Sequence, residues 1–297
     1  MTDPPPLPGV THRYVEARGL RVHVAEAGNG PPLVLQHGWP QHWYAWHAIL
    51  PALAERFRVI CPDMRGFGWT DAPADGYDKD GLAEDLLAVC DALGIERFSL
   101  AGHDWGGYVS FIVAMRWPER VERLVLLNTG HGFIKVDLRL LRAQLGFWYM
   151  PIIGTPVLGP ALVRRGAIVR AIVRWAHPGG VPWDDASRET YLAPLRERAR
   201  ARATQRLYGR FVAREFPRVL LGRWKRERLT VPTLFLHGAA DRILRPDFLR
   251  GYERYADDLR LEMLAGAGHF VCDAEPERVA QRMIAFLLPQ TGTAPSP

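Results

Sequence analysis

The chain has 297 residues, of which 48% are hydrophobic and 10% aromatic, enough for a sizeable core and too many for a disordered or fibrous protein. It opens with Pro-rich residues 1–8 and has no basic segment followed by an apolar one, so we expect no secretory signal. The three cysteines, Cys61, Cys90 and Cys272, show no metal-ligand spacing, and we expect reduced thiols in a cytoplasmic protein.

The formal net charge of +6 is unevenly distributed along the chain. Residues 135–228 contain 20 Lys and Arg against seven Asp and Glu, a local charge of +13 that leaves −7 elsewhere. Such a basic insert could bind nucleic acid, anionic lipid or an acidic partner. Because no nucleic-acid motif accompanies the arginines, we favour a solvated helical surface and expect no nucleic-acid partner.

The first half of the chain alternates between strand-like and helix-like patterns. Strand patterns occur at residues 13–17, 21–27, 33–36, 58–61, 98–101 and 123–127. The last four are nearly continuous apolar runs, which are typical of strands buried on both faces of a parallel sheet. Helical patterns lie between them at residues 43–55, 82–93 and 106–116.

The same alternation returns near the C-terminus, after a long helical insertion over residues 135–230. It predicts a strand at 233–236, a helix near 247–255, a strand at 260–264 and a helix at 276–288. Within the insertion, residues 143–163 carry no charge, but interspersed prolines and glycines would break a membrane-spanning helix. We therefore predict no transmembrane segment and an apolar cap over a pocket.

These patterns predict an α/β fold with a mostly parallel sheet flanked by helices. The core domain would comprise residues 1–134 and 231–297. A helical cap domain, residues 135–230, would be inserted after the sixth strand.

The most informative motif is GHDWG at residues 102–106, between an apolar strand pattern and a helical one. This context predicts a sharp strand-turn-helix junction that presents Asp104 above the sheet, although an Asp here could also simply cap the helix. A carboxylate is suited to displacing a leaving group from an sp³ carbon, which gives an ester on the enzyme. Hydrolysis of that ester then needs a base and an oxyanion hole.

Two later residues are candidates for the base and its partner. His269 lies in a loop ahead of the last helix, where its imidazole can reach the sheet edge and activate water. Asp241 follows another strand and would orient the imidazole, the alternative being a turn-forming Asp. The order nucleophile, acid, histidine is that of α/β-hydrolases. The loop after Leu127 begins with Asn128, so it offers no carboxylate at the other common acid position.

The oxyanion hole is predicted to consist of two backbone N–H groups, those of Trp39 and Trp105. Trp39 belongs to the HGWP tetrapeptide at 37–40, which follows an apolar strand, and Trp105 directly follows the nucleophile. The side chains of His37, Trp39 and Trp105 are also candidates for contact with the substrate.

With these residues in place, the chain resembles the epoxide hydrolase and haloalkane dehalogenase branch of the α/β-hydrolase superfamily over residues 12–289. The resemblance rests on HGWP at 37–40, DMRGFG at 63–68, GHDWGG at 102–107, Asp241 and GHF at 268–270. It implies the α/β-hydrolase fold and an aspartate nucleophile without a metal or organic cofactor.

Within this branch, dehalogenases hold halide with two side-chain N–H donors, commonly a Trp after the nucleophile plus an Asn in the oxyanion loop or a cap Trp. Trp105 matches the first donor, whereas the oxyanion-loop position holds Trp39, as is typical of epoxide hydrolases. Fluoroacetate-type dehalogenases carry arginines after the nucleophile, where this chain has Trp105 and Tyr108. That departure argues against them.

Epoxide hydrolases of this branch use two cap tyrosines to donate to the epoxide oxygen. The resemblance implies this role for Tyr149, early in the insertion, and Tyr208, late in it, though either could be an aromatic core residue. Trp148 and Trp183 are candidates for pocket walls or, as an alternative, a halide donor.

The sequence therefore predicts an epoxide hydrolase that converts a small apolar epoxide and water to a vicinal diol. A haloalkane dehalogenase with the same nucleophile is the alternative. A non-catalytic ligand-binding protein is a third hypothesis, but a receptor has no need for Asp241. Substrate identity, stereochemistry and oligomeric state stay open, with a homodimer as one option.

Overall fold

In a computed structural model of the chain, which describes residues 3–133, 144–176 and 183–288, eight strands form one sheet. Its strand order is β1-β2-β4-β3-β5-β6-β7-β8. The strands are β1 (Thr11–Ala17), β2 (Leu20–Ala27), β3 (Pro32–Gln36), β4 (Arg58–Pro62), β5 (Phe98–His103), β6 (Val121–Leu127), β7 (Thr233–Gly238) and β8 (Leu259–Leu264). All eight strands that the sequence predicts are confirmed, and the sheet is mostly parallel.

Only the first two strands depart from the parallel arrangement: β1 pairs antiparallel with β2, and β2 with β4. From β4 to β8 all neighbours run parallel. Side chains of β5 and β7 are buried throughout, which explains their continuous apolar runs. Because parallel strands end at the same edge, the loops after β3, β5, β6, β7 and β8 meet there.

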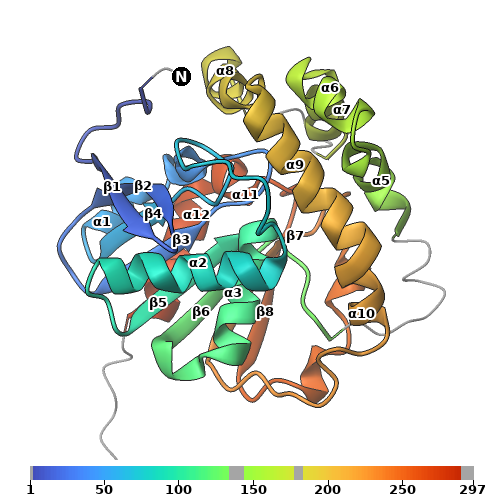
Figure 1. The fold of residues 1–297 in the computed structure, drawn as a ribbon. Coiled ribbons are helices and arrows are strands. Elements are labelled where there is room, and N and C mark those ends of the chain that lie inside the picture. Colours follow the sequence, from blue (N-terminus) through green and yellow to red (C-terminus); the bar gives the residue numbers. More distant parts are fainter. Residues whose placement is uncertain (1–2, 134–143, 177–182, 289–297) are drawn as a thin grey trace, which may run out of the picture.

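Helices cover both faces of the sheet (Figure 1). The longer helices α2 (Lys79–Ala92) and α3 (Trp105–Arg116) pack on one face, where residues such as Leu86 and Ile112 join side chains of the strands in one apolar cluster. On the other face, α1 (Leu50–Ala54), α11 (Val271–Ala274) and α12 (Pro276–Leu287) form a second cluster. The sheet is thus buried between two helical layers.

A group of helices between β6 and β7 lies beside the edge where the parallel strands end (Figure 1). It consists of η3 (Gln144–Phe147), α5 (Tyr149–Gly154), α6 (Leu158–Arg164), α7 (Ala167–Ala176), α8 (Asp185–Leu195), α9 (Arg198–Arg210), η4 (Phe211–Glu215) and α10 (Phe216–Leu220). These are the inserted helices, as the fold prediction expected. The division into domains at residues 135 and 230 stays a prediction.

The uncharged stretch at 143–163 is divided between α5 and α6 in its described part, since the helices are interrupted between Gly154 and Leu158. In the described part of the chain, no helix is both long and apolar enough to cross a membrane.

Two helix predictions were wrong in detail. Residues 247–255 form only the short 3₁₀ turns η5 (Pro246–Leu249) and η6 (Tyr252–Arg254), because Gly251 between them adopts a left-handed φ of 96°. Residues 43–55 divide into the 3₁₀ helix η1 (Trp43–Trp46) and α1, and the short α11 was not predicted.

Candidate active site

The junction between β5 and α3 presents Asp104 at the carboxyl edge of the sheet. Its backbone lies at φ 50° and ψ −122°, a region that L-residues rarely occupy. Gly106 lets the start of α3 approach the carbonyl oxygens of Gln36 and His37 so closely that a Cβ would collide with both. Backbone strain of this kind is concentrated at functional turns, which supports the predicted nucleophile junction.

His269 and Asp241 lie next to this turn and hydrogen-bond each other. The imidazole Nδ1 of His269 donates to Oδ2 of Asp241 over 2.9 Å. This fixes the tautomer, so that the other nitrogen, Nε2, faces Oδ1 of Asp104 at 3.7 Å. The structure thus brings together the three side chains that the sequence placed in three separate loops.

Each carboxylate oxygen of Asp241 accepts two hydrogen bonds. Its Oδ1 accepts from the backbone N–H groups of Ile243 and Leu244 at 2.8 and 3.0 Å. Its Oδ2 accepts from the Asn128 amide at 2.7 Å as well as from His269. The carboxylate therefore has a single orientation, which suits a group that holds another in place.

The predicted oxyanion loop approaches Asp104 directly. The backbone N–H of Trp39 donates to Oδ2 of Asp104 over 2.9 Å. A Cβ at Gly38 would lie 2.6 Å from that same oxygen, so only glycine permits this approach. The N–H of Trp105 also acts on Asp104, since both amides lower the pKa of its carboxyl. Oδ2 is thus on the side of the predicted oxyanion hole, and Oδ1 faces His269.

Burial is the largest single influence on the pKa of each of the three groups, but it sets the direction of the shift only for Asp104. It raises the pKa of Asp104 to about 6, against the opposing effects of His269 and the two backbone amides. Burial also opposes charge on Asp241, but His269, His237 and Asn128 outweigh it and hold the pKa of Asp241 below its usual value. For His269, burial lowers the pKa of the imidazole, but the carboxylates of Asp241 and Asp104 together outweigh it and raise that pKa.

Tyr149 and Tyr208 are both buried, and both come from the inserted helices. Their ring centroids are 5.9 Å apart, and each ring packs against Trp39. Burial, with the nearby Asp104 carboxylate, raises the pKa of both phenols well above 10. The hydroxyls therefore keep their protons at neutral pH and can donate them.

A small apolar cavity of about 70 Å³ opens beside Asp104. Asp104 and Trp105 line it together with Tyr108, Met150 and Phe211, among others, whereas neither Tyr149 nor Tyr208 is on its wall. The indole Nε1 of Trp105 is buried and makes no hydrogen bond of acceptable geometry among the described residues, although it lies close enough to the Tyr208 hydroxyl to lower the pKa of that phenol. The cavity therefore suits a small apolar group.

Two of the predicted substrate contacts lie elsewhere. Trp148 is 44% exposed and packs on Tyr149, away from both Asp104 and the small cavity. His37 is fully buried, and its Nε2 accepts from the backbone N–H of Met64 at 2.9 Å. It therefore supports the loop behind the site. Trp183 is buried against Phe270, with ring centroids 4.5 Å apart.

Sequence reasoning missed several supporting residues. Asn128 was noted only as a position without a carboxylate, yet its amide anchors Asp241 and also donates to the Gly268 carbonyl. The hydroxyl of Thr129 donates to the backbone carbonyl of Asp104 over 2.6 Å. The fully buried Lys79 lies under Trp105 and carries no motif, so only its neighbours in space could reveal it.

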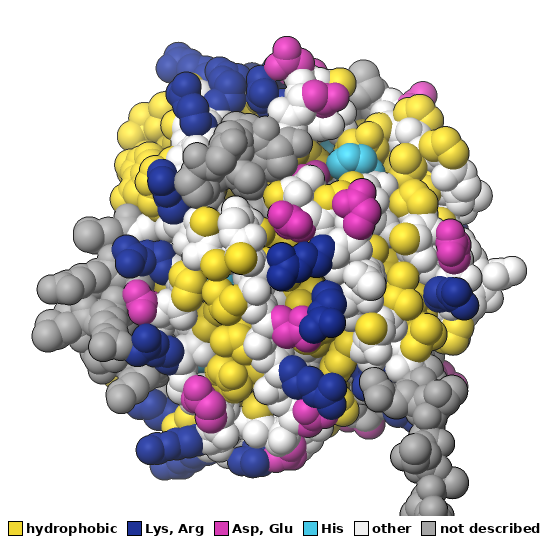
Figure 2. Space-filling view, turned by 180° about the vertical axis from the view of Figure 1, so that it is seen from behind, with side chains coloured by type: hydrophobic (Ala, Val, Ile, Leu, Met, Phe, Trp, Pro, Cys, Tyr) yellow, Lys and Arg dark blue, Asp and Glu magenta, His cyan; other side chains and the backbone are white. Residues whose placement is uncertain are grey.

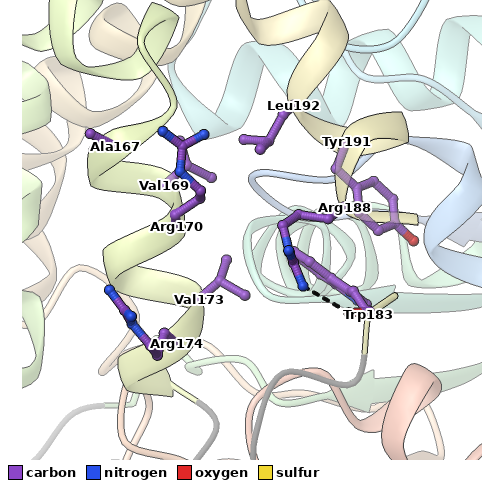
Figure 3. Close-up of a pocket in the computed structure, with 9 residues that line it drawn as sticks. All are labelled: Ala167, Val169, Arg170, Val173, Arg174, Trp183, Arg188, Tyr191 and Leu192. Atoms are coloured by element: carbon purple, nitrogen blue, oxygen red, sulfur yellow. Dashed lines mark hydrogen bonds between the residues drawn. The ribbon is translucent and has the colours of Figure 1, made fainter. Parts of the chain in front are cut away.

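A larger cavity of about 530 Å³ lies between α7 and the region of Trp183 and α8 (Figure 3). Arg170, Arg174 and Arg188 line it with Val173 and Leu192, among others. Arg188 donates to the Trp183 carbonyl and pairs with Asp185, both within the insertion. Seen from behind, Lys and Arg side chains gather at the upper left, over inserted helices (Figure 2). Some of the arginines that give the insertion its charge of +13 therefore lie on the surface around this cavity.

The described residues include no group of three or more His, Cys, Asp or Glu that could hold a metal ion. The three cysteines are free and buried.

Comparisons with known proteins agree with this geometry. A family model described as the alpha/beta hydrolase fold matches residues 31–276. Haloalkane dehalogenase 2 of Mycobacterium tuberculosis is 31% identical over 291 residues, covering 95% of this chain and 96% of that protein. The soluble epoxide hydrolase of a Corynebacterium species is 46% identical over 126 residues, covering 42% of this chain and only 44% of that protein's length.

Among solved structures, the ligand-free epoxide hydrolase CorEH superposes with a TM-score of 0.83 at 29% identity, covering 94% of this chain and 98% of that one. The chain therefore belongs to the α/β-hydrolase superfamily, in the branch that contains epoxide hydrolases and haloalkane dehalogenases.

Proposed function

We propose that the chain is an epoxide hydrolase that forms a covalent ester on Asp104. The observation that carries the proposal is the pair of buried, protonated phenols of Tyr149 and Tyr208 around Trp39. Opening an epoxide releases an alkoxide that needs a proton, whereas a departing halide needs none. Two protonated phenols that feel the charge of a nearby carboxylate nucleophile are therefore better suited to an epoxide.

In the first step, Oδ1 of Asp104 attacks an epoxide carbon, the carbon–oxygen bond breaks, and its electron pair stays on the epoxide oxygen. A tyrosine hydroxyl gives that oxygen its proton. Oδ2 is the better candidate for the carbonyl oxygen of the resulting ester, since it already accepts from the Trp39 N–H. The nucleophile must be ionised for this attack, which a carboxyl with a pKa of about 6 is at neutral pH.

In the second step, water attacks the Cγ atom of Asp104, and Nε2 of His269 takes its proton. Charge develops on Oδ2, where the N–H groups of Trp39 and Trp105 stabilise it. Collapse breaks the bond between Cγ and Oδ1, and the diol departs with Oδ1, which takes the proton held by His269. The water oxygen stays in the carboxyl group of Asp104, whose remaining proton returns to the tyrosinate left by the first step. Asp241 stabilises the imidazolium formed in between.

Haloalkane dehalogenation is the second candidate. It is favoured by the buried Nε1–H of Trp105, which makes no hydrogen bond of acceptable geometry among the described residues and could hold a halide. The match to haloalkane dehalogenase 2 also extends over 95% of the chain.

An assay with one aryl epoxide and one bromoalkane separates the two functions by scoring diol against bromide release. If the phenols donate to the epoxide oxygen, Tyr208→Phe should lower epoxide turnover roughly 10- to 10³-fold while the protein stays folded. Unchanged turnover in both Tyr149→Phe and Tyr208→Phe would contradict the proposal. Bromide release that depends on Trp105 would favour the dehalogenase.

A further inference from the structure

A buried lysine, Lys79, packs against the ring of Trp105, the residue that follows Asp104. Lys79 is the first residue of α2 and is 0% exposed. Its Nζ lies 4.3 Å from the ring centroid of Trp105 and 5.1 Å from that of Phe211. An ammonium at these distances interacts with the electron-rich faces of both rings.

The cation is held in place by the inserted helices. Its Nζ donates to the carbonyl of Leu207, the residue before Tyr208, and lies 3.7 Å from Oε1 of Glu215. The other oxygen of Glu215 accepts from the backbone N–H of Lys79 at 3.0 Å. Glu215 ends the π-helical turn η4, a type of distortion that is frequent at functional sites.

Burying an ion pair in a protein core costs free energy of desolvation that apolar side chains would not cost. Desolvating two charges costs several kcal/mol per ion, and apolar residues of the same volume often stabilise a fold as well or better. Burial lowers the pKa of Lys79, while Glu215, Asp78 and Asp104 oppose that effect. Packing alone therefore gives no reason for a charge at this position.

The position of the Lys79 ammonium over the Trp105 ring suggests what this buried charge does. A cation on the face of an indole draws electron density toward itself and makes the ring N–H a stronger donor. That N–H belongs to Trp105, whose ring lines the cavity beside Asp104. Its Nε1 makes no hydrogen bond of acceptable geometry among the described residues, and the polar group it acts on is the hydroxyl of Tyr208.

We propose that Lys79 is a positioning residue for the first chemical step, and this rests on the proposed function of Asp104 as nucleophile. Its ammonium holds the Trp105 indole and strengthens the N–H that stabilises the negative atom leaving the carbon, whether alkoxide oxygen or halide. Through the Leu207 carbonyl it also fixes the turn that carries Tyr208. The second step, hydrolysis of the ester, takes place at His269 and should not need Lys79.

The test uses a double variant, Lys79→Met/Glu215→Gln, which removes both members of the ion pair and leaves no unpaired buried charge. The rates of the two chemical steps are measured separately in this variant. Ester formation is followed by mass in the His269→Gln background, and ester hydrolysis by single turnover with His269 present. Weakening one pre-organised donor should slow ester formation roughly 10- to 100-fold and leave hydrolysis nearly unchanged. Ester formation at the parental rate, or equal slowing of both steps, would overturn the inference.

A matched control exists in the same region. Arg223 pairs with Asp80 at 2.6 Å, linking the chain after the inserted helices to the first turn of α2, and lies 4.6 Å over the ring of Trp224. Arg223→Met/Asp80→Asn removes this ion pair, a cation over an indole and the weaker contact of Asp80 with Arg116 at 3.2 Å, without touching Trp105. We expect its ester formation to stay within about twofold of the parent. If ester formation slowed as much in this control as in Lys79→Met/Glu215→Gln, we would attribute both losses to reduced stability of the fold.

Bromide tests the inference without turnover. In Asp104→Asn, which removes the repelling carboxylate charge, ⁸¹Br line broadening should report a bound anion. The broadening should disappear on adding Trp105→Phe or Lys79→Met/Glu215→Gln. Absent broadening in Asp104→Asn, or broadening that persists without the Lys79 pair, would contradict the role of Lys79, even for a chain that hydrolyses epoxides. Conversely, lack of any diol, halide or ester would count against the proposed function alone.

Discussion

Nε2 of His269 faces Oδ1 of Asp104 at 3.7 Å, close to the carboxylate but beyond hydrogen-bond distance. Since Nδ1 donates to Asp241, the nitrogen that faces Asp104 carries the lone pair when the imidazole is neutral. An imidazole that is not bonded to the nucleophile is free to accept a proton from water. This arrangement suits a base that acts after the nucleophile, on the ester, better than one that activates the nucleophile itself.

The raised pKa of Asp104 predicts how activity depends on pH. Only the ionised carboxylate attacks, so kcat/KM should fall about tenfold per unit as the pH drops below about 6. His269 lowers the pKa of Asp104, so ester formation in His269→Gln should fall at a higher pH. The measurement is kcat/KM, and the rate of ester formation, from pH 4.5 to 9. A rate that is constant from pH 5 to 8 would contradict the prediction.

The same shift predicts a cost to stability. The pKa of Asp104 is about 6 in the fold against 3.8 as its ordinary value, so above pH 6 the fold carries a penalty of about 3 kcal/mol that is absent below pH 3.8. Asp104→Asn should therefore raise the free energy of unfolding by up to that amount at pH 8, and by about half as much at pH 5. Urea unfolding at both pH values provides the check. An equal gain at both would show that the charge is not its source.

Asn128 should affect the second step and spare the first. Its amide donates to Asp241 over 2.7 Å and lowers the pKa of that carboxyl. Asn128→Ala should leave the His269–Asp241 pair less well held and slow ester hydrolysis by roughly 10-fold, as is common for groups that orient a catalytic side chain. Single-turnover rates of both steps are the measurement. Slower ester formation with unchanged hydrolysis would be the opposite of this expectation.

The basic insert is predicted to be a solvated surface. If so, binding to duplex DNA should be weak and should vanish at moderate salt. Arg170→Gln/Arg174→Gln, on the rim of the larger cavity, should leave epoxide turnover unchanged. Tight, salt-resistant binding to DNA or anionic vesicles would show that the charge serves a partner.

Much of the architecture could be predicted because it depends on local patterns. The strands β3 to β6 are apolar runs of a kind that only burial on both faces explains. Each of Asp104, Asp241 and His269 follows a predicted strand, which is why the sequence could place all three at the same edge of the sheet. The conformation near residue 250 could not be predicted, because a single glycine, Gly251, ends a pattern that is otherwise helical.

The supporting residues escaped prediction for another reason. Asn128 and Asp241 are 113 positions apart, and Lys79 and Glu215 are 136 apart, so no spacing rule connects them. Lys79 looks like an ordinary surface lysine at the start of a helix until the fold places it under Trp105. The exposure of Trp148 likewise depends on how the inserted helices pack.

The most direct test of the central claim, that Asp104 is a covalent nucleophile, is a single turnover in ¹⁸O-water with enzyme in excess over epoxide. The account predicts that the heavy oxygen enters the Asp104 carboxylate, located by peptide mapping, while the first diol formed carries none. Heavy oxygen in that diol with an unlabelled Asp104 would mean that water attacks the epoxide directly, and would contradict the account.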